Sequence, residues 1–218
     1  MTALAKLFSD QVAIAIADES AWHGVLYPEE SYYLANMHPQ RRREFTAGRV
    51  CARRVLQTLG IECFPLRVGE GRAPLWPPTV IGSISHCDGF CAAVAMRPVD
   101  GVLGIGLDVE PSGPLDEEVV ALVCTEVERV WCRSAPFLTE GAWGKIIFSA
   151  KESVYKALFP VSGLFLEFQD VELEIDPAVM RFRARLTPSA PCSLPEAICG
   201  RIEIDEKYVY TGATLRRN

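Results

Sequence analysis

Two spacings of hydrophobic residues organise the chain. The spacing of an amphipathic helix is clearest over residues 39–59, where Pro39 suits the first helical position and Gly60 the residue just past the end. A second long helix is predicted from residue 139 or 140 to 158, ended by Pro160. Shorter helices are predicted over residues 20–37, 115–123 and 125–131, the last opened by a capping box at Thr125 and Glu128.

Extended segments with apolar residues fill most of the remaining chain. Strands are predicted over residues 11–17, 80–84, 90–96, 102–110, 166–175, 180–186, 197–204 and 208–215. A turn at residues 97–101 separates two stretches that each contain one long helix and several strands. The pattern therefore predicts an α+β protein with two halves, residues 1–100 and 101–218.

Composition narrows the class of protein. The 218 residues are 49% hydrophobic and 23% charged, as in ordinary soluble domains. No apolar run approaches the roughly 20 residues of a membrane span, and Asp10 interrupts the only apolar stretch near the N-terminus. We therefore expect a cytoplasmic protein without a membrane partner, whose eight cysteines are free thiols. The net charge of −6 argues against a nucleic-acid partner.

Two short segments carry the candidate chemistry. Asp108 and Glu110 are two residues apart on a predicted strand, so their carboxylates share a face. Glu152 and Lys156 are four residues apart on a predicted helix and also share a face. Three carboxylates form an oxygen-donor set that suits Mg²⁺, and a lysine beside them can offset phosphate charge. The combination indicates phosphoryl chemistry.

These segments belong to a longer series of motifs. In chain order the series is RRREFTAGR (41–49), GRAPLWP (71–77), GSISHC (82–87), GLDVE (106–110) and FSAKESVYK (148–156). The series resembles the signature of the 4′-phosphopantetheinyl transferases, within them the larger monomeric group that includes the activating enzymes of enterobactin and surfactin synthetases. The resemblance covers residues 41–156.

The resemblance implies both a fold and a reaction. It implies a pseudo-twofold α+β fold whose two similar α/β halves bind coenzyme A at their interface. Residues 1–100 would bind the nucleotide, and residues 101–218 would carry Mg²⁺ and the catalytic groups. The enzyme would be a cytoplasmic monomer that moves 4′-phosphopantetheine from coenzyme A to a serine of an apo acyl or peptidyl carrier protein in siderophore, polyketide or nonribosomal peptide synthesis. Adenosine 3′,5′-bisphosphate would be released.

The resemblance also assigns roles to individual residues. The predicted metal ligands are Asp108, Glu110 and Glu152, and the predicted catalytic residues are Glu152 and Lys156. The residues expected to bind coenzyme A are Arg49, Arg53, Arg72, Ser85, His86, Lys151 and Lys156, the Ser85–His86 pair through the 3′-phosphate. Glu152 could be a metal ligand, a base for the serine proton, or both.

Other interpretations remain open at this point. Arg41, Arg43 and Arg54 are expected to be solvated surface charges, whereas Arg42 and Arg53 fit either that role or a phosphate contact equally well. Glu152 and Lys156 alone would be an ordinary exposed ion pair that contributes only about 0.3–0.5 kcal/mol. A Mg²⁺-dependent nuclease or nucleotide hydrolase could use the same acids and lysine. A non-catalytic module that binds coenzyme A or a carrier protein is the third alternative.

Overall fold

The computed structural model describes residues 2–99, 101–188, 190 and 196–217, without the side chain of residue 196. The chain folds into two compact units, a smaller one of Ser9–Asp100 and a larger one that combines Met1–Phe8 with Gly101–Asn218. The predicted halves differ from this division only in the first eight residues, which belong with the larger unit. The separate roles predicted for residues 1–100 and 101–218 remain predictions.

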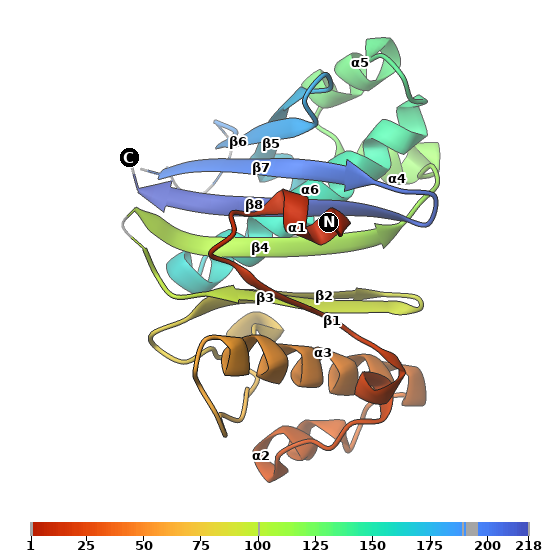
Figure 1. Cartoon of the computed structure of the whole chain (residues 1–218). Coiled ribbons are helices and arrows are strands. Elements are labelled where there is room, and N and C mark those ends of the chain that lie inside the picture. Colours follow the sequence, from red (N-terminus) through yellow and green to blue (C-terminus); the bar gives the residue numbers. More distant parts are fainter. Residues whose placement is uncertain (1, 100, 189, 191–195, 218) are drawn as a thin grey trace. The chain divides into compact units, whose positions relative to one another are not determined.

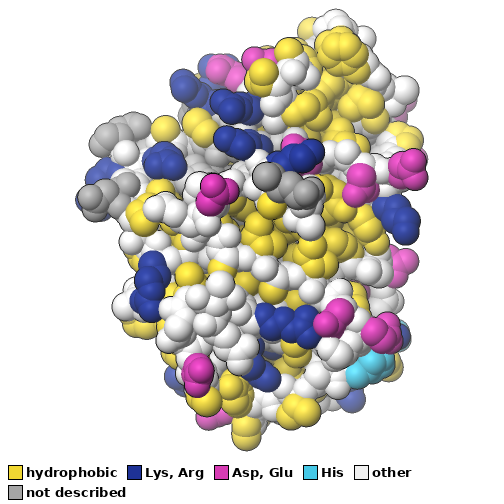
Figure 2. Space-filling model, in the orientation of Figure 1, with side chains coloured by type: hydrophobic (Ala, Val, Ile, Leu, Met, Phe, Trp, Pro, Cys, Tyr) yellow, Lys and Arg dark blue, Asp and Glu magenta, His cyan; other side chains and the backbone are white. Residues whose placement is uncertain are grey.

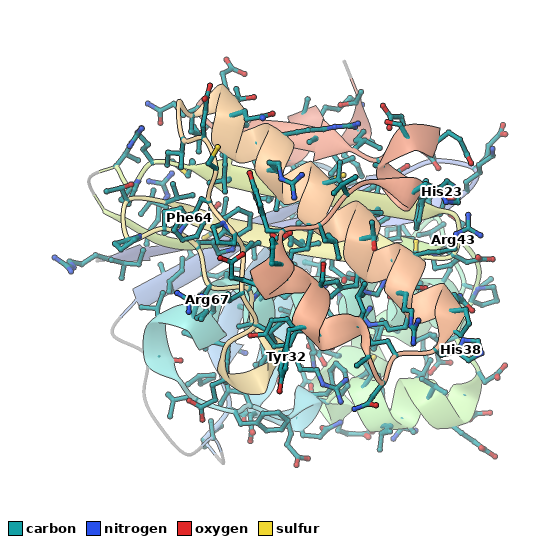
Figure 3. All side chains as sticks on the ribbon, turned by 90° about the horizontal axis from the view of Figure 1, so that it is seen from below. His23, Tyr32, His38, Arg43, Phe64 and Arg67 are labelled. Carbon is teal, nitrogen blue, oxygen red and sulfur yellow. The ribbon has the colours of Figure 1, made fainter. Side chains whose placement is uncertain are left out.

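The smaller unit is a helix packed on a three-stranded antiparallel sheet. Its strands β1 (Ala13–Ile16), β2 (Ile81–Cys87) and β3 (Phe90–Met96) are ordered β1-β3-β2. The helix α3 (Pro39–Thr58) buries Ala52, Val55 and Leu56 against this sheet. Figures 1 and 3 show α3 crossing the strands. The helix begins at Pro39, as predicted, and Gly60 (φ 74°) follows its end.

The predicted helix over residues 20–37 is wrong. This stretch forms three short pieces instead: η1 (Glu19–His23), α2 (Pro28–Ser31) and η2 (Tyr32–Leu34). Tyr27 precedes Pro28 and is extended, because the proline ring disfavours helical geometry at the residue before it. One more short turn, η3 (Glu70–Arg72), lies between α3 and β2.

The larger unit contains a five-stranded antiparallel sheet with helices on both faces. Its strands are β4 (Val102–Pro111), β5 (Val171–Asp176), β6 (Arg181–Leu186), β7 (Glu196–Ile204) and β8 (Tyr208–Arg217), in the order β4-β8-β7-β6-β5. The helix α6 (Glu140–Ser162) crosses behind the sheet in Figure 1, and the short α1 (Ala3–Leu7) lies in front of β7 and β8. The helices α4 (Glu117–Val123) and α5 (Glu126–Ser134) pack on α6. The turn η4 (Phe168–Asp170) precedes β5.

Two predicted boundaries in the larger unit are also wrong. The helix α6 continues through Pro160 to Ser162 and ends at Gly163, whose φ of 66° allows a left-handed cap. Proline removes one main-chain N–H, and this late position near the helix end tolerates the loss. The strand expected from residue 166 starts at Val171, after η4. The predicted capping box of α5 is confirmed, since Thr125 and Glu128 exchange hydrogen bonds.

The predicted α+β class is confirmed, since each unit pairs one long helix with an antiparallel sheet. A twofold relation between the units, and coenzyme A between them, remain predictions. No helix among the described residues has the length and apolar character to cross a bilayer. The seven cysteines within the described part of the chain are free thiols, and Cys192 lies outside it.

The contact between α6 and β4 depends on two glycines of the strand. A Cβ atom on Gly106 would lie 1.8 Å from the carbonyl oxygen of Ser153, and one on Gly104 would lie 2.2 Å from that of Ala157. These obstacles are main-chain atoms of α6, which cannot rotate away as a side chain can. Hydrogen at both positions therefore lets the helix lie directly on the strand.

We expect Gly106→Ala to destabilise the larger unit by about 3 kcal/mol, because the added methyl group must push α6 away from β4. Urea unfolding followed by circular dichroism measures the loss. Gly48→Ala on α3 is the control, since its nearest contact would be the Ile84 side chain at 3.1 Å and no main-chain atom. Equal stability of Gly106→Ala and the wild type would contradict this account of the helix contact.

Candidate active site

The candidate catalytic residues of the larger unit lie where α6 covers β4. Gly104 and Gly106 face the helix, and alternation along the strand places Asp108 and Glu110 on the same face, just beyond the close contact. From the helix, Lys156 reaches Asp108 and Lys145 reaches Glu110. The predicted shared face of the two carboxylates thus agrees with these contacts.

Asp108 is held by two side chains of α6, Lys156 and Ser149. Its Oδ1 lies 2.6 Å from the Lys156 Nζ, and its Oδ2 accepts a hydrogen bond of 2.8 Å from the Ser149 hydroxyl. Only 3% of Asp108 is exposed, so few water molecules compete for these contacts. A carboxylate in this position is fixed in orientation and compensated in charge.

Glu110 lies nearer the surface and has a different lysine partner. Its Oε2 is 3.7 Å from the Nζ of Lys145, whose side chain is 15% exposed. Burial raises the pKa of Glu110, and the nearby charge of Asp108 raises it further, while Lys145 and Lys156 act in the opposite direction. A further positive charge nearby would therefore stabilise the ionised form of the Glu110 carboxylate.

Glu152 and its neighbours line a cavity of about 400 Å³ in the larger unit. Burial raises the pKa of Glu152, Lys156 counteracts this shift, and Asp108 adds to it. The cavity wall is mostly apolar, with Tyr155, Leu166 and Phe168 among its residues. A half-buried carboxylate with a raised pKa at the end of an apolar cavity is suited to accept a proton. Tyr155 is thus a wall residue of this cavity.

The acids meet part of the requirement for Mg²⁺. Asp108 raises the pKa values of both Glu110 and Glu152, so the three charges lie near one another. Within the described ranges, however, no three His, Cys, Asp or Glu side chains are grouped closely enough to hold a metal ion together. Asp108 and Glu110 fit as two hard oxygen ligands, with phosphate and water oxygens completing an octahedron. Glu152 as third ligand remains a prediction.

The Lys151 ammonium group has three partners within the fold, and its predicted contact with coenzyme A stays a prediction. The Lys151 Nζ donates to Glu128 Oε2 at 2.7 Å and to the carbonyl oxygens of Val123 and Phe168. An ammonium group has three N–H donors, so these three acceptors use all of them. Lys151 therefore anchors α6 to Glu128, and it lines the same cavity as Glu152.

In the smaller unit, His86 is part of a charged cluster with α3. His86 on β2 contacts the Arg41 guanidinium through Nε2, and its Nδ1 lies 3.4 Å from the Glu44 carboxylate. Arg41 also contacts Glu44 at 3.3 Å. The sequence predicts that Arg41 is a solvated surface charge. In the structure it is instead a partner of His86 and Glu44. Arg43, in contrast, is exposed near the N-terminal end of α3 (Figure 3).

Arg49 and Arg53, two arginines of α3 that are expected to bind coenzyme A, differ in their partners. Arg49 is buried, its guanidinium lies over the Phe45 ring, and its Nε has no hydrogen-bond partner among the described residues. Burial lowers the pKa of Arg49 to about 10. Arg53 instead bonds to Glu30 and to the Val25 carbonyl oxygen. The Nε of Arg53 also has no hydrogen-bond partner among the described residues, so an anion would satisfy a buried nitrogen of either arginine.

Two other predicted coenzyme A ligands of this unit, Ser85 and Arg72, lie in different surroundings from His86. Ser85 is buried and lies on the opposite face of β2, since Ile84 and His86 face α3. Arg72 is exposed at the end of η3, with a φ of 65°. Arg42 bonds to the carbonyl oxygens of Ala35 and Met37, which favours its structural role. The proposed contacts of Ser85 and Arg72 with coenzyme A remain predictions.

Sequence reasoning missed three residues that contact the candidate site. Lys145 is seven residues before Glu152, two helical turns away, so the helical repeat could have placed it on the same face. Ser149 is three residues before Glu152 and was not considered. Thr211 comes from β8, and no local pattern connects it to Asp108.

Comparisons with known proteins identify the family of this chain. The model of the 4′-phosphopantetheinyl transferase N-terminal domain matches residues 29–96, and that of the 4′-phosphopantetheinyl transferase superfamily matches residues 104–205. The 4′-phosphopantetheinyl transferase Svp of Streptomyces mobaraensis is 43% identical over 168 residues, which are 77% of this chain and 68% of Svp. The chain belongs to the 4′-phosphopantetheinyl transferase family.

Two further relatives place the transferase among the larger members. PptT of Mycobacterium tuberculosis is 36% identical over 68% of this chain and 65% of its own length. Enterobactin synthase component D of Escherichia coli (strain K12) is 34% identical over 63% of this chain and 66% of its own length. The predicted family and enzyme class are therefore confirmed.

Solved structures add little for this transferase. A holo-(acyl-carrier-protein) synthase from Bacillus anthracis, solved in complex with CoA (3',5'-ADP), has a TM-score of 0.42 and 19% identity. It covers 54% of this chain and 99% of its own. A similarity this distant supports no assignment of individual residues.

The buried Lys151–Glu128 pair gives a direct test of the role of this lysine. We expect Lys151→Met to reduce the free energy of unfolding by about 3–5 kcal/mol, because Glu128 is left buried without its cation. Urea unfolding measures the change. Lys6→Met is the matched control, since its pair with Glu203 is exposed and contributes at most about 1 kcal/mol. A stable Lys151→Met variant with weakened coenzyme A binding would instead support the predicted coenzyme A role.

Proposed function

We propose that this transferase moves 4′-phosphopantetheine from coenzyme A to a serine hydroxyl of an apo acyl or peptidyl carrier protein, with release of adenosine 3′,5′-bisphosphate. The observation that carries the proposal is the grouping of Asp108, Glu110, Glu152 and Lys156 on one helix–strand contact in a chain of this family. Phosphoryl transfer requires mainly positioned groups and compensated charge.

The reaction balances with the groups at hand. The carrier serine oxygen forms a bond to the phosphorus that bears the pantetheine arm, and the bond from that phosphorus to the nucleotide phosphate oxygen breaks. The serine proton passes to the Glu152 carboxylate, whose raised pKa favours accepting it. The Lys156 ammonium lies one helical turn from Glu152 and offsets the charge on the departing phosphate.

Mg²⁺ is part of the proposal. Asp108 and Glu110 would hold it, with Glu152 as a possible third ligand, and when bound it would neutralise charge on the pyrophosphate oxygens. Asp108 is paired with Lys156 and Glu110 with Lys145, so the negative charge of both acids is partly compensated within the fold. Glu152 can serve as base whether or not it also binds the metal.

The nucleotide end of coenzyme A would be bound by cations of the smaller unit. His86 and Arg41 form a donor cluster suited to the 3′-phosphate, and Arg49 offers a guanidinium nitrogen without a partner among the described residues. Ser85 and Arg72 remain proposed contacts. Arg53 and Lys151 also remain proposed contacts. Both bond within the fold, but the Arg53 Nε has no partner among the described residues and Lys151 lines the cavity beside Glu152.

The cavity beside Glu152 suits the pantetheine arm. Its volume of about 400 Å³ and mostly apolar wall match an uncharged chain of amide and methylene groups that ends in a thiol. An arm bound there would have its phosphate end near the carboxylates. The carrier protein, a monomeric state and a cytoplasmic location remain predictions.

A nuclease with the same acids is a weaker alternative. Nucleic-acid enzymes usually present a broad basic surface, but the net charge here is −6. Figure 2 shows Lys and Arg side chains mixed with Asp and Glu on the face that it displays. Nothing specific in the structure favours a nuclease.

Replacement of Glu152 tests the catalytic assignment. We expect Glu152→Gln to lower the rate of pantetheine transfer by about 100-fold or more, because an amide cannot accept the serine proton. Mass spectrometry of an apo carrier protein incubated with coenzyme A and Mg²⁺ measures the transfer. Glu140→Gln on the same helix, which loses only a contact with Arg133, should remain active. Full activity of Glu152→Gln with an unchanged circular dichroism spectrum would remove Glu152 from catalysis.

Replacement of His86 tests the nucleotide assignment. We expect His86→Ala to weaken binding of coenzyme A by about tenfold or more, since hydrogen bonds to charged groups contribute roughly 1.5–3 kcal/mol. Binding of 3′-dephospho-coenzyme A should change little, and calorimetry with both ligands measures the difference. His38→Ala is the control, because the His38 side chain makes no capping bond at the start of α3 (Figure 3). Equal losses for the two ligands would contradict a 3′-phosphate contact.

A further inference from the structure

Two hydroxyl groups lie beneath the candidate metal ligand Asp108. Ser149 on α6 and Thr211 on β8 are both 0% exposed. Thr211 is the direct cross-strand partner of Asp108, so both side chains point at α6, where Ser149 lies. The surrounding helix–sheet contact is otherwise a hydrophobic core.

The hydrogen bonds of this group run in one direction. The Ser149 hydroxyl donates to Asp108 Oδ2 at 2.8 Å, which uses its single proton. Thr211 Oγ1 lies 2.9 Å from Ser149 Oγ and 2.8 Å from the Ser149 carbonyl oxygen. Thr211 donates its single proton to Ser149, to the carbonyl oxygen or shared with the hydroxyl oxygen, so Thr211 holds Ser149 and Ser149 holds Asp108.

This arrangement fixes the orientation of the Asp108 carboxylate. Both hydroxyl groups are fully buried, so water cannot easily replace either one, and loss of either removes a hydrogen bond that holds this group together. With Oδ2 held by Ser149, Oδ1 points at the side where Lys156 lies. Ser153, one turn further along α6, is equally buried but donates only to the main-chain oxygen of Ala150.

We propose that Ser149 and Thr211 are positioning residues that hold Asp108 in the orientation in which it binds Mg²⁺. The inference rests on the proposed function, in which Asp108 is a metal ligand. Groups that hydrogen-bond to metal ligands commonly change metal affinity by about 10- to 100-fold when removed. Thr211 acts through Ser149, and Ser149 acts through Asp108.

Binding of Mn²⁺ in place of Mg²⁺ tests the inference without relying on activity. Electron paramagnetic resonance of the full chain with coenzyme A measures the free ion. We expect Ser149→Ala and Thr211→Val to weaken Mn²⁺ binding by about tenfold. Thr211→Ser keeps the hydroxyl group and should bind like the wild type, and so should Ser153→Ala. Excess Mg²⁺ should recover much of the transfer rate lost in Ser149→Ala, which a general packing defect would not allow.

Each other outcome counts against the inference. Wild-type Mn²⁺ affinity in both Ser149→Ala and Thr211→Val would overturn the positioning role, provided that Asp108→Ala binds weakly. An equal loss in Ser153→Ala would show that any buried hydroxyl of α6 matters alike, which also overturns it. If Asp108→Ala binds Mn²⁺ as well as the wild type, the proposed metal ligand is wrong and the positioning role falls with it. Thr211→Val keeps the side-chain shape, so melting temperatures separate folding from metal binding.

Discussion

The close contact between α6 and β4 determines where the chemistry of the larger unit can occur. Gly104 and Gly106 let the main chain of α6 lie directly on β4. Space for side chains on the helix-facing side of the strand begins after Gly106. The first two such side chains are Asp108 and Glu110. A helix held farther from the sheet would leave Lys156 and Ser149 out of reach of Asp108. Packing and chemistry here therefore depend on the same missing Cβ atoms.

Charge balance is the second constraint on this site. Burial raises the pKa values of Glu110 and Glu152, and Asp108 raises both further. Lys145 and Lys156 offset part of this repulsion in the folded chain. Such a site combines closely spaced acids with the ammonium groups of Lys145 and Lys156. It can accept a dication and an anionic phosphate together, because the charge of each offsets the repulsion that the other would meet.

Much of this site follows from short-range regularities in the sequence. Strand alternation puts Asp108 beside Glu110, and the helical repeat puts Lys156 on the side of Glu152, so both pairs could be predicted. The role of Lys151 could not, because adjacency in a motif says nothing about which side of a helix meets the core. Ser149 and Thr211 were missed because their contact joins α6 to β8, 62 residues apart. Element boundaries were also hard to predict. The stretch before α3 forms short pieces where one helix was expected, and α6 continues past Pro160, because tertiary contacts also decide where a helix begins and ends.

The placement of α1 has a consequence for how the protein can be divided. The first eight residues belong with the larger unit, and Leu7 and Phe8 pack close to Gly212 on β8. Residues 1–8 thus belong to the larger unit, residues 9–100 form the smaller unit, and the larger unit resumes at residue 101. A fragment that begins at residue 101 would lack this cover and expose apolar sheet surface to solvent. Split or circularly permuted versions would need the opening segment rejoined to the C-terminal part of the chain.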